Sequence, residues 1–101
     1  MLNLFKSIFG SSDSANIQDI LSDGAVLIDV RSPGEFAGGH VKGAVNIPLD
    51  QVDARIAQIK RYNKPIVLCC ASGMRSARAK GLLISQGITD VHDAGSWRNI
   101  R

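Results

Sequence analysis

The sequence has few aromatic residues and no long apolar run. Only five of its 101 residues are Phe, Trp or Tyr, and no cluster of Lys and Arg interleaves with them, so nucleic-acid binding is not indicated. No apolar stretch approaches the roughly 20 residues that a membrane-spanning helix requires. The first ten residues are interrupted by Lys6 and lack the apolar stretch of a secretory signal. We therefore expect a cytoplasmic protein that neither spans a membrane nor binds nucleic acid.

Cysteine is also scarce, and the two that occur, Cys69 and Cys70, are neighbours in the chain. Adjacent cysteines rarely form a disulfide, so a secreted disulfide framework is not expected. Two thiols without a second cluster of Cys or His make a poor zinc site. We expect neither a bound metal nor a cofactor.

The length and charge of the chain point to one domain that handles small anions. A chain of 101 residues fits one typical domain of about 100–150 residues. Residues 1–50 carry three basic and six acidic side chains, a net of −3, and residues 51–101 carry nine basic and three acidic, a net of +6. This asymmetry favours small anions near whatever the second half builds.

Apolar runs alternate with helix signals along most of the chain. The predicted strands cover residues 25–28, 44–47, 65–69 and 88–92, and the predicted helices cover residues 16–21, 49–60 and 75–86. A further short helix is predicted after Ser32, because Ser32, Pro33 and Glu35 stand at the N-cap, first and third positions of a capping box. The alternation predicts an α/β fold with a mostly parallel sheet and helices on both faces.

The first residues of the chain are expected to form an extension of the domain. Leu2, Phe5 and Phe9 would line one face of a short helix. A membrane-surface anchor is one interpretation, but about ten residues make a marginal helix, and packing on the chain's own domain is the simpler one. We divide the chain into an extension, residues 1–15, and a domain, residues 16–101.

The candidate chemistry lies where the third predicted strand ends, at Cys70. Ligands of open α/β sheets bind outside the carboxyl ends of the strands. The small residues that follow let the loop curl so that backbone N–H groups point inward, and Gly73 is free to adopt a positive φ. Arg75 and the start of the next helix add positive potential. These features should lower the pKa of the Cys70 thiol and hold an anion beside its sulfur.

At this point the sequence resembles the rhodanese, or sulfurtransferase, family, in particular its single-domain members. The resemblance covers about residues 16–98 and rests on fragments in a fixed order: Ile28-Asp29-Val30-Arg31, Glu35-Phe36, Gly39-His40-Val41, Gly43-Ala44, Asn46-Ile47-Pro48, Cys70-Ala71-Ser72-Gly73-Met74-Arg75-Ser76 and Gly95-Ser96-Trp97. The resemblance implies a rhodanese-like fold with a central, mostly parallel five-stranded sheet.

The resemblance also implies an activity and its site residues. Cys70 would be the catalytic nucleophile and would carry the sulfur as a persulfide, and the substrate-binding loop would comprise Ala71, Ser72, Gly73, Met74 and Arg75. The partners would be a small anionic sulfur donor such as thiosulfate and a thiophilic acceptor such as cyanide or a thiol, including one on a protein. We expect a monomer or a weak homodimer.

Two alternatives to catalytic sulfur transfer stay open. The chain could be a persulfide carrier that hands sulfur to a partner protein. It could also be a Cys-dependent phosphatase or arsenate reductase, although relatives of those kinds have one more residue between Cys and Arg than the four found here. Any of these assignments requires that the Cys70 side chain reach solvent and that the loop amides face its sulfur.

Other polar residues near the strand ends are assigned structural roles. Cys69 should point to the opposite face of the sheet from Cys70 and be buried. Asp29 and Arg31 are expected to hold loops through ion pairs and backbone hydrogen bonds. The resemblance makes His40 a packing and hydrogen-bonding residue, and Trp97 is expected to cap the core.

Overall fold

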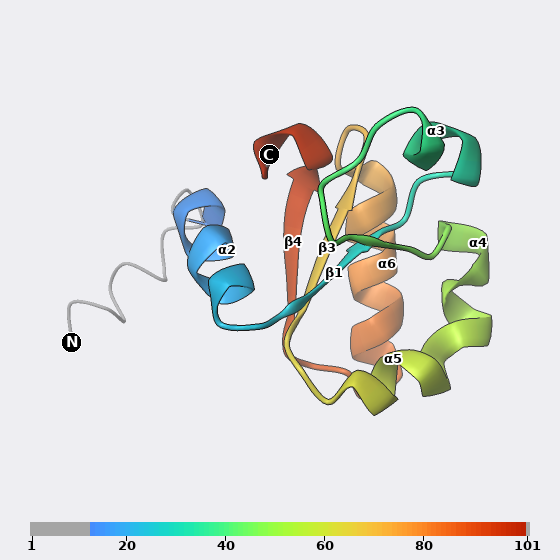
Figure 1. The fold of residues 1–101 in the computed structure, drawn as a ribbon. Helices are drawn as coiled ribbons and strands as arrows, with labels where there is room; N and C mark the ends of the chain where they lie inside the picture. The colour runs from blue at the N-terminus through green and yellow to red at the C-terminus, as the bar shows by residue number, and fades with distance from the viewer. Residues whose placement is uncertain (1–12, 101) are drawn as a thin grey trace.

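A parallel sheet of four strands forms the centre of the molecule in the computed structural model, which describes residues 13–100 (Figure 1). The strands are β1 (Val26–Asp29), β2 (Val45–Asn46), β3 (Ile66–Cys70) and β4 (Val91–Ser96). Their order across the sheet is β2-β1-β3-β4, and every neighbouring pair is parallel. In the register, Ile28 of β1 lies beside Val45 on one side and Leu68 on the other.

The predicted α/β architecture is confirmed, but the expected number of strands is wrong. The described residues form four strands where five were expected. The number five came from the family resemblance, whereas the chain itself has four apolar runs of strand type. The residues before β1 form a helix, because Asn16 to Ser22 place apolar side chains at helical spacing around Ile17 and Ile20.

Helices cover both faces of the sheet, as the alternation predicts. One face is covered by α4 (Leu49–Val52), α5 (Ile56–Tyr62) and α6 (Met74–Ser85), and the other by α2 (Asp13–Ser22) and the 3₁₀ turn η3 (Trp97–Asn99). Figure 1 shows α2 apart from α4, α5 and α6, with the strands between them. Because both faces are buried, all five residues of β3 are buried.

Several element boundaries differ from the predictions for local reasons. The helix predicted over residues 49–60 is divided by a 3₁₀ turn, η2 (Asp53–Arg55). β4 starts three residues after the predicted strand at 88, because Ile88 packs against the core while Thr89 and Asp90 form the exposed connection. α6 ends at Ser85 with Gln86 as its cap, one residue before the predicted end. Gly87 follows the cap with a φ of +89°, and Ile88 N–H donates to Leu83 O at 2.9 Å.

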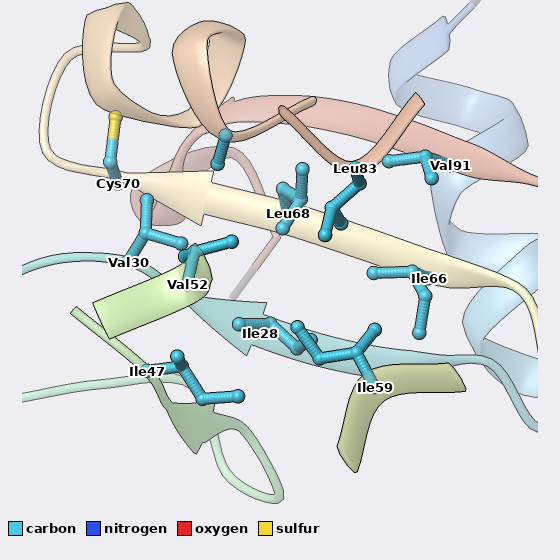
Figure 2. Packing of buried hydrophobic residues seen from close by; sticks show 11 residues of the cluster. Ile28, Val30, Ile47, Val52, Ile59, Ile66, Leu68, Cys70, Leu83 and Val91 are labelled. Carbon is cyan, nitrogen blue, oxygen red and sulfur yellow. The ribbon is translucent and has the colours of Figure 1, made fainter. Parts of the chain in front are cut away.

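The core consists of two layers of buried side chains, one on each face of the sheet. Figure 2 shows the larger layer, in which Ile28, Leu68 and Leu83 lie together with Cys70 at one end. Cys69 belongs to the other layer, with Ile17 and Val67. The prediction that the two neighbouring cysteines point to opposite faces is confirmed, since successive side chains of a strand alternate.

The carboxyl ends of the strands form one edge, where the candidate chemistry was placed. β1 ends at Asp29 and β3 at Cys70, and Cys70 lies opposite Ser96 of β4. A bulge separates Cys70 from Leu68, which pairs with Asp93, so β4 holds one residue more than β3 over this stretch. At this point Gly95 lies close to the loop after Cys70. A Cβ added to Gly73 would lie 3.7 Å from Gly95 Cα.

Two further predictions concern membrane-spanning helices and the first residues of the chain. Within residues 13–100 no helix is long and apolar enough to cross a bilayer. The expected helix face of Leu2, Phe5 and Phe9 lies outside the described residues. The division of the chain at residue 15 therefore stays a prediction.

Leu68 offers a test of the packing that positions Cys70. Because Leu68 is fully buried in the larger core layer, Leu68→Ala should lower the free energy of unfolding by about 2–5 kcal/mol. Urea denaturation followed by circular dichroism measures this loss. Ile84→Ala is the control, since Ile84 is 45% exposed and its truncation should cost less than about 1 kcal/mol. Equal losses in the two variants would contradict the packing described here.

Candidate active site

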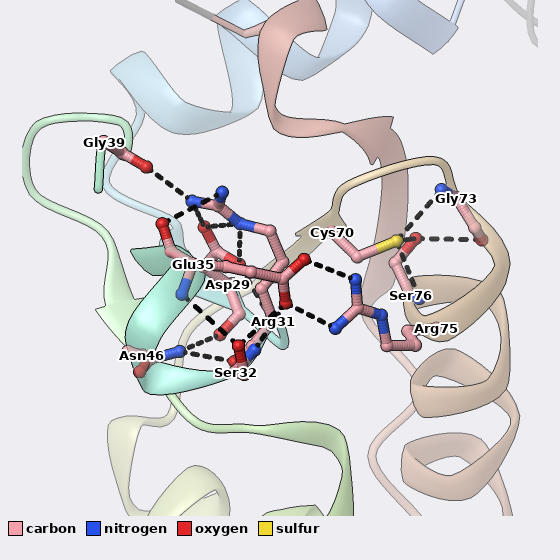
Figure 3. A network of polar contacts seen from close by, with 10 residues as sticks. All are labelled: Asp29, Arg31, Ser32, Glu35, Gly39, Asn46, Cys70, Gly73, Arg75 and Ser76. Carbon is pink, nitrogen blue, oxygen red and sulfur yellow. Dashed lines mark hydrogen bonds and ion pairs between the residues drawn. The ribbon is translucent and has the colours of Figure 1, made fainter. Parts of the chain in front are cut away.

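Cys70 is the last residue of β3, and the chain turns back over its sulfur before α6 begins at Met74 (Figure 3). Gly73 caps the helix with a φ of +107°, a left-handed conformation that glycine adopts without a steric penalty. The predicted positive φ at Gly73 is confirmed. It turns the backbone so that the start of α6 faces the sulfur.

Two backbone amides point at the Cys70 sulfur. Gly73 N–H donates to Cys70 Sγ at 2.9 Å, and Ser76 N–H donates to it at 3.3 Å. One of the two requirements for a reactive Cys70, that the loop amides face its sulfur, is therefore met. Fixed N–H dipoles of this kind stabilise negative charge on the atom they surround.

The hydroxyl of Ser76 completes the surroundings of the sulfur. Ser76 is fully buried, and its Oγ lies 3.4 Å from Cys70 Sγ. In the thiol form Sγ donates to this Oγ, which in turn donates to Gly73 O at 3.1 Å. Once the thiol loses its proton, the same hydroxyl is placed to donate to the sulfur.

The two neighbouring thiols have opposite pKa shifts. Burial opposes ionisation of Cys70, but hydrogen bonds from the Ser76 hydroxyl and from the amides of Ser76, Gly73 and Ser72 outweigh it and lower the pKa of Cys70. Burial raises the pKa of Cys69 to about 12, and the nearby Asp29 carboxylate adds to the effect. Of the two thiols, Cys70 is therefore the one whose surroundings favour the thiolate.

The second requirement for a reactive Cys70, that its side chain reach solvent, is not met in this conformation. The Cys70 side chain is 0% exposed, so the expectation that it reaches solvent is wrong here. The physical reason is the turn itself: the amides that face the sulfur belong to a backbone that closes over it. A reagent can reach Sγ only if the loop that covers it moves.

Arg75 forms an ion pair with Glu35 across the edge of the sheet. Its Nη1 donates to Glu35 Oε1 at 2.7 Å and its Nη2 to Oε2 at 3.0 Å. The bidentate contact with Arg75 is the main reason that the pKa of Glu35 falls to about 2, and hydrogen bonds from Ser32 add to it. The guanidinium that was predicted to bind the donor anion is here held by an internal carboxylate.

The remaining loop residues differ in exposure. Ala71 is half-buried, Ser72 is exposed, and Met74 is 78% exposed at the start of α6. Of the predicted loop, the structure thus brings Gly73 to the sulfur by its own amide and places the Met74 side chain outside. Their predicted contacts with a substrate stay predictions.

A buried ion pair between Asp29 and Arg31 holds the neighbouring loops in place. Arg31 Nη2 lies 2.8 Å from Asp29 Oδ2 and also donates to Gly39 O at 2.7 Å. Asn46 Nδ2 donates to the carbonyls of Asp29 and Arg31. The guanidinium of Arg31 lies 4.5 Å from the ring centroid of Trp97, which packs against the smaller core layer. The structural roles predicted for these residues are confirmed.

His40 also has the packing role predicted for it. Its ring stacks on Phe36 with centroids 3.7 Å apart, and Nδ1 lies 2.7 Å from Phe36 O. His92 interacts with Asp90, with Nε2 2.8 Å from Oδ1. These hydrogen bonds place both histidines in contacts away from Cys70.

Two residues of the site were not among those predicted. Ser76 appeared only as the end of a motif, although its position directly after Arg75, in the first turn of a helix, is a signal for a hydroxyl near the sulfur. Glu35 was assigned to a capping box, which the structure confirms. Its pairing with Arg75 had no local signal, because 40 residues separate the two and only the adjacency of β1 and β3 brings their loops together.

The comparison with known families agrees with this geometry. Residues 13–100 match the family described as Rhodanese-like domain. The chain belongs to this family. The matched residues include every residue of the site around Cys70, and the resemblance proposed from the sequence is confirmed.

Three similar proteins illustrate the relationship of this rhodanese-like domain. The uncharacterized protein YqhL of Bacillus subtilis is 48% identical over 69 residues, which make up 68% of this chain and 54% of YqhL, so the match spans about half of that protein. The thiosulfate sulfurtransferase PspE of Escherichia coli is 40% identical, over 72% of this chain and 71% of PspE. The structure of the human single-domain sulfurtransferase TSTD1 superposes with a TM-score of 0.71 at 31% identity, covering 84% of this chain and 88% of TSTD1.

The part that Ser76 plays in lowering the pKa of Cys70 can be measured directly. Ser76→Ala removes the hydroxyl but keeps the amide, so the pKa of Cys70 should rise and the thiolate fraction at neutral pH should fall. Titration of the thiolate ultraviolet absorbance, with Cys70→Ala as the blank, reports this change. Ser85→Ala is the matched control, because the exposed Ser85 hydroxyl contacts only Leu82 O of the same helix. An unchanged titration midpoint in Ser76→Ala would show that the amides suffice.

Proposed function

We propose that this chain is a sulfurtransferase that carries a sulfane sulfur on Cys70. The observation that supports this proposal most directly is the Sγ atom at the end of β3, which accepts hydrogen bonds from the amides of Gly73 and Ser76 and has a lowered pKa. A thiolate so placed is both a nucleophile and, after it gains a sulfur, an anion that the same donors stabilise.

The proposed reaction has two steps that share the Cys70 sulfur. In the first, the thiolate attacks the outer sulfur of thiosulfate, a new S–S bond forms, the S–S bond of the donor breaks, and sulfite leaves with its electron pair. The products are a Cys70 persulfide anion and sulfite. In the second, an acceptor such as cyanide attacks the outer sulfur, leaves as thiocyanate and returns the thiolate. Charge and atoms balance in both steps.

No proton donor is needed for this chemistry. Sulfite is a good leaving group as an anion, so neither step requires a general acid. The surroundings of Cys70 fit such a reaction, since the hydrogen bonds of His40 and His92 go to Phe36 and Asp90. The work of the site is electrostatic: the loop donors stabilise the charge that moves from the thiolate to the persulfide, as oxyanion donors do at about 3 kcal/mol each in other enzymes.

The reaction also requires a movement of the loop. Because Cys70 is fully enclosed in this conformation, the outer sulfur of a donor can reach Sγ only when residues 71–74 shift away from it. The exposed positions of Ser72 and Met74 leave these two side chains with little packing to lose in such a shift. We propose that donor binding selects the open loop.

The relatives support the choice of sulfur transfer over other thiolate chemistry. PspE carries the name thiosulfate sulfurtransferase, and thiosulfate is accordingly the donor that we propose for this chain. The four residues between Cys70 and Arg75 form a smaller loop than the phosphatases and arsenate reductases of similar fold possess. We therefore propose a site for one additional sulfur atom rather than for a tetrahedral oxyanion.

A second candidate is a carrier that delivers the Cys70 sulfur to a partner protein. The feature that favours it is Met74, an apolar side chain that is 78% exposed at the start of α6, one residue after the amide that contacts Sγ. The rates at which the persulfidated chain transfers its sulfur to cyanide and to a small dithiol protein distinguish the two candidates. A carrier should transfer to the protein faster, and Met74→Gln should slow only that reaction.

Replacement of Cys70 tests the proposed nucleophile. Cys70→Ala should abolish thiosulfate:cyanide turnover and the gain of one sulfur atom on treatment with thiosulfate, which intact-protein mass spectrometry detects, because no other thiol of the described chain has a lowered pKa. The matched control is Cys69→Ala, which should lower stability by about 1–2 kcal/mol but keep the adduct. A wild-type chain that never gains the sulfur, or an adduct that forms on Cys69, would refute the proposal.

A further inference from the structure

Glu35 forms an ion pair with Arg75, the arginine at the end of the loop that surrounds the Cys70 sulfur. Its carboxylate holds both Nη atoms of Arg75 in a bidentate contact at 2.7 and 3.0 Å, as a bound oxyanion would hold them. Arg75 is the first cation after Cys70, at the second residue of α6, and Arg78 follows it in the same helix. The positive charge of Arg75 is therefore already paired with a carboxylate of the same chain.

The carboxylate is fixed in place by contacts on its own side of the site. Glu35 Oε1 accepts hydrogen bonds at 3.0 Å from both the amide and the hydroxyl of Ser32, which caps α3 (Pro33–Ala37). The pKa of Glu35 is about 2, so it is ionised at every pH at which the thiolate exists. Because α3 is anchored in turn by Arg31, which donates to Glu35 O, Glu35 is held beside Arg75 rather than free to turn away.

The ion pair stands at the approach to the loop. Arg75 lines a cavity of about 580 Å³ with Leu49 and Arg78, and Glu35 lines a hollow of about 320 Å³ with Ala71 and Arg98. Arg78 and Arg98 are exposed, and water and salt screen their charges, as they also weaken those of Arg75 and Glu35, whose side chains are 37% and 39% exposed. The ion pair thus links two hollows, each bordered by a residue that follows Cys70 in the chain, Arg75 or Ala71.

The charge of the donor then decides how strongly it is repelled. The Cys70 thiolate carries one negative charge, and a dianion such as thiosulfate experiences about twice the repulsion that a monoanion of the same size experiences. A free Arg75 would offset this difference, whereas an Arg75 paired with Glu35 does not. The pairing therefore lowers the advantage that a free Arg75 would give to a dianionic donor over a monoanionic one.

We propose that Glu35 is a specificity-determining residue that lowers the preference of this site for dianionic donors such as thiosulfate, so that monoanionic sulfane-sulfur donors, the class of thiosulfonates and persulfides, are also accepted. The proposal rests on the proposed function and names the donor class for the same site. It assigns Glu35 a role in selectivity besides its part in capping α3.

Two donors of nearly equal size test this assignment. Methanethiosulfonate anion is thiosulfate with one charged oxygen replaced by a methyl group. The Cys70 thiolate attacks its outer sulfur, the S–S bond of the donor breaks, and methanesulfinate leaves with the electron pair, so each donor yields the same Cys70 persulfide. The ratio of kcat/KM for thiosulfate to kcat/KM for methanethiosulfonate measures the selectivity for charge.

Glu35→Gln is the decisive variant, because Gln retains the capping-box contact at this position and removes only the charge. The ratio should rise about threefold in Glu35→Gln, because the freed charge of Arg75 attracts the dianion about twice as strongly as the monoanion. The control, Ser32→Ala, breaks the cap of the same helix but leaves both charges, and should change the ratio less than about twofold.

Anion binding gives a second measurement that does not depend on sulfur transfer. In a Cys70→Ala background, Glu35→Gln should bind sulfate about tenfold more tightly and methanesulfonate about threefold more tightly, because the freed charge of Arg75 acts about twice as strongly on the dianion. Failure of persulfide formation with either donor would refute the proposed function and leave this binding comparison intact. An unchanged or lowered ratio, or equal effects on sulfate and methanesulfonate, would overturn the role of Glu35 by showing that it only positions Arg75.

Discussion

The turn between β3 and α6 is the constraint on which the rest of this site depends. A parallel strand delivers Cys70 to the edge of the sheet, and the left-handed Gly73 reverses the chain within three residues. The amides of Gly73 and Ser76 can face one sulfur only because α6 starts at that point. The same geometry that stabilises a thiolate also encloses it, so reactivity and access are opposed in this fold and a loop movement must reconcile them.

The contrast between the two cysteines shows how much of the chemistry is a matter of position. Cys69 and Cys70 share a strand, a residue type and complete burial. Cys69 points into the layer below α2, where burial raises its pKa to about 12. Cys70 points to the end of the other layer, where the sheet stops and hydrogen-bond donors begin. One step along a strand changes the face, and the face decides which thiol can react.

A second interaction joins the two halves of the chain at this edge. The acidic first half supplies Glu35 and the basic second half supplies Arg75, and the sheet order places the loops after β1 and β3 side by side. The network of Asp29, Arg31 and Asn46 fixes the loop that carries Glu35. The basic charge that the sequence assigns to anion binding is thus partly paired within the chain, and the edge of the sheet beside Cys70 is less positive than composition alone indicates.

The sequence by itself determined the alternation of strands and helices, the capping box at Ser32, the left-handed Gly73 and the position of Cys70 at a strand end, because each depends on residues within a few positions of one another. It did not determine the length of β4, the burial of Cys70 or the partner of Arg75. The number of strands was wrong where a family expectation replaced the four apolar runs of the chain. Only the tertiary structure decided these features, since enclosure of a sulfur and pairing across 40 residues depend on which strands lie next to each other, and short-range patterns carry no record of that adjacency.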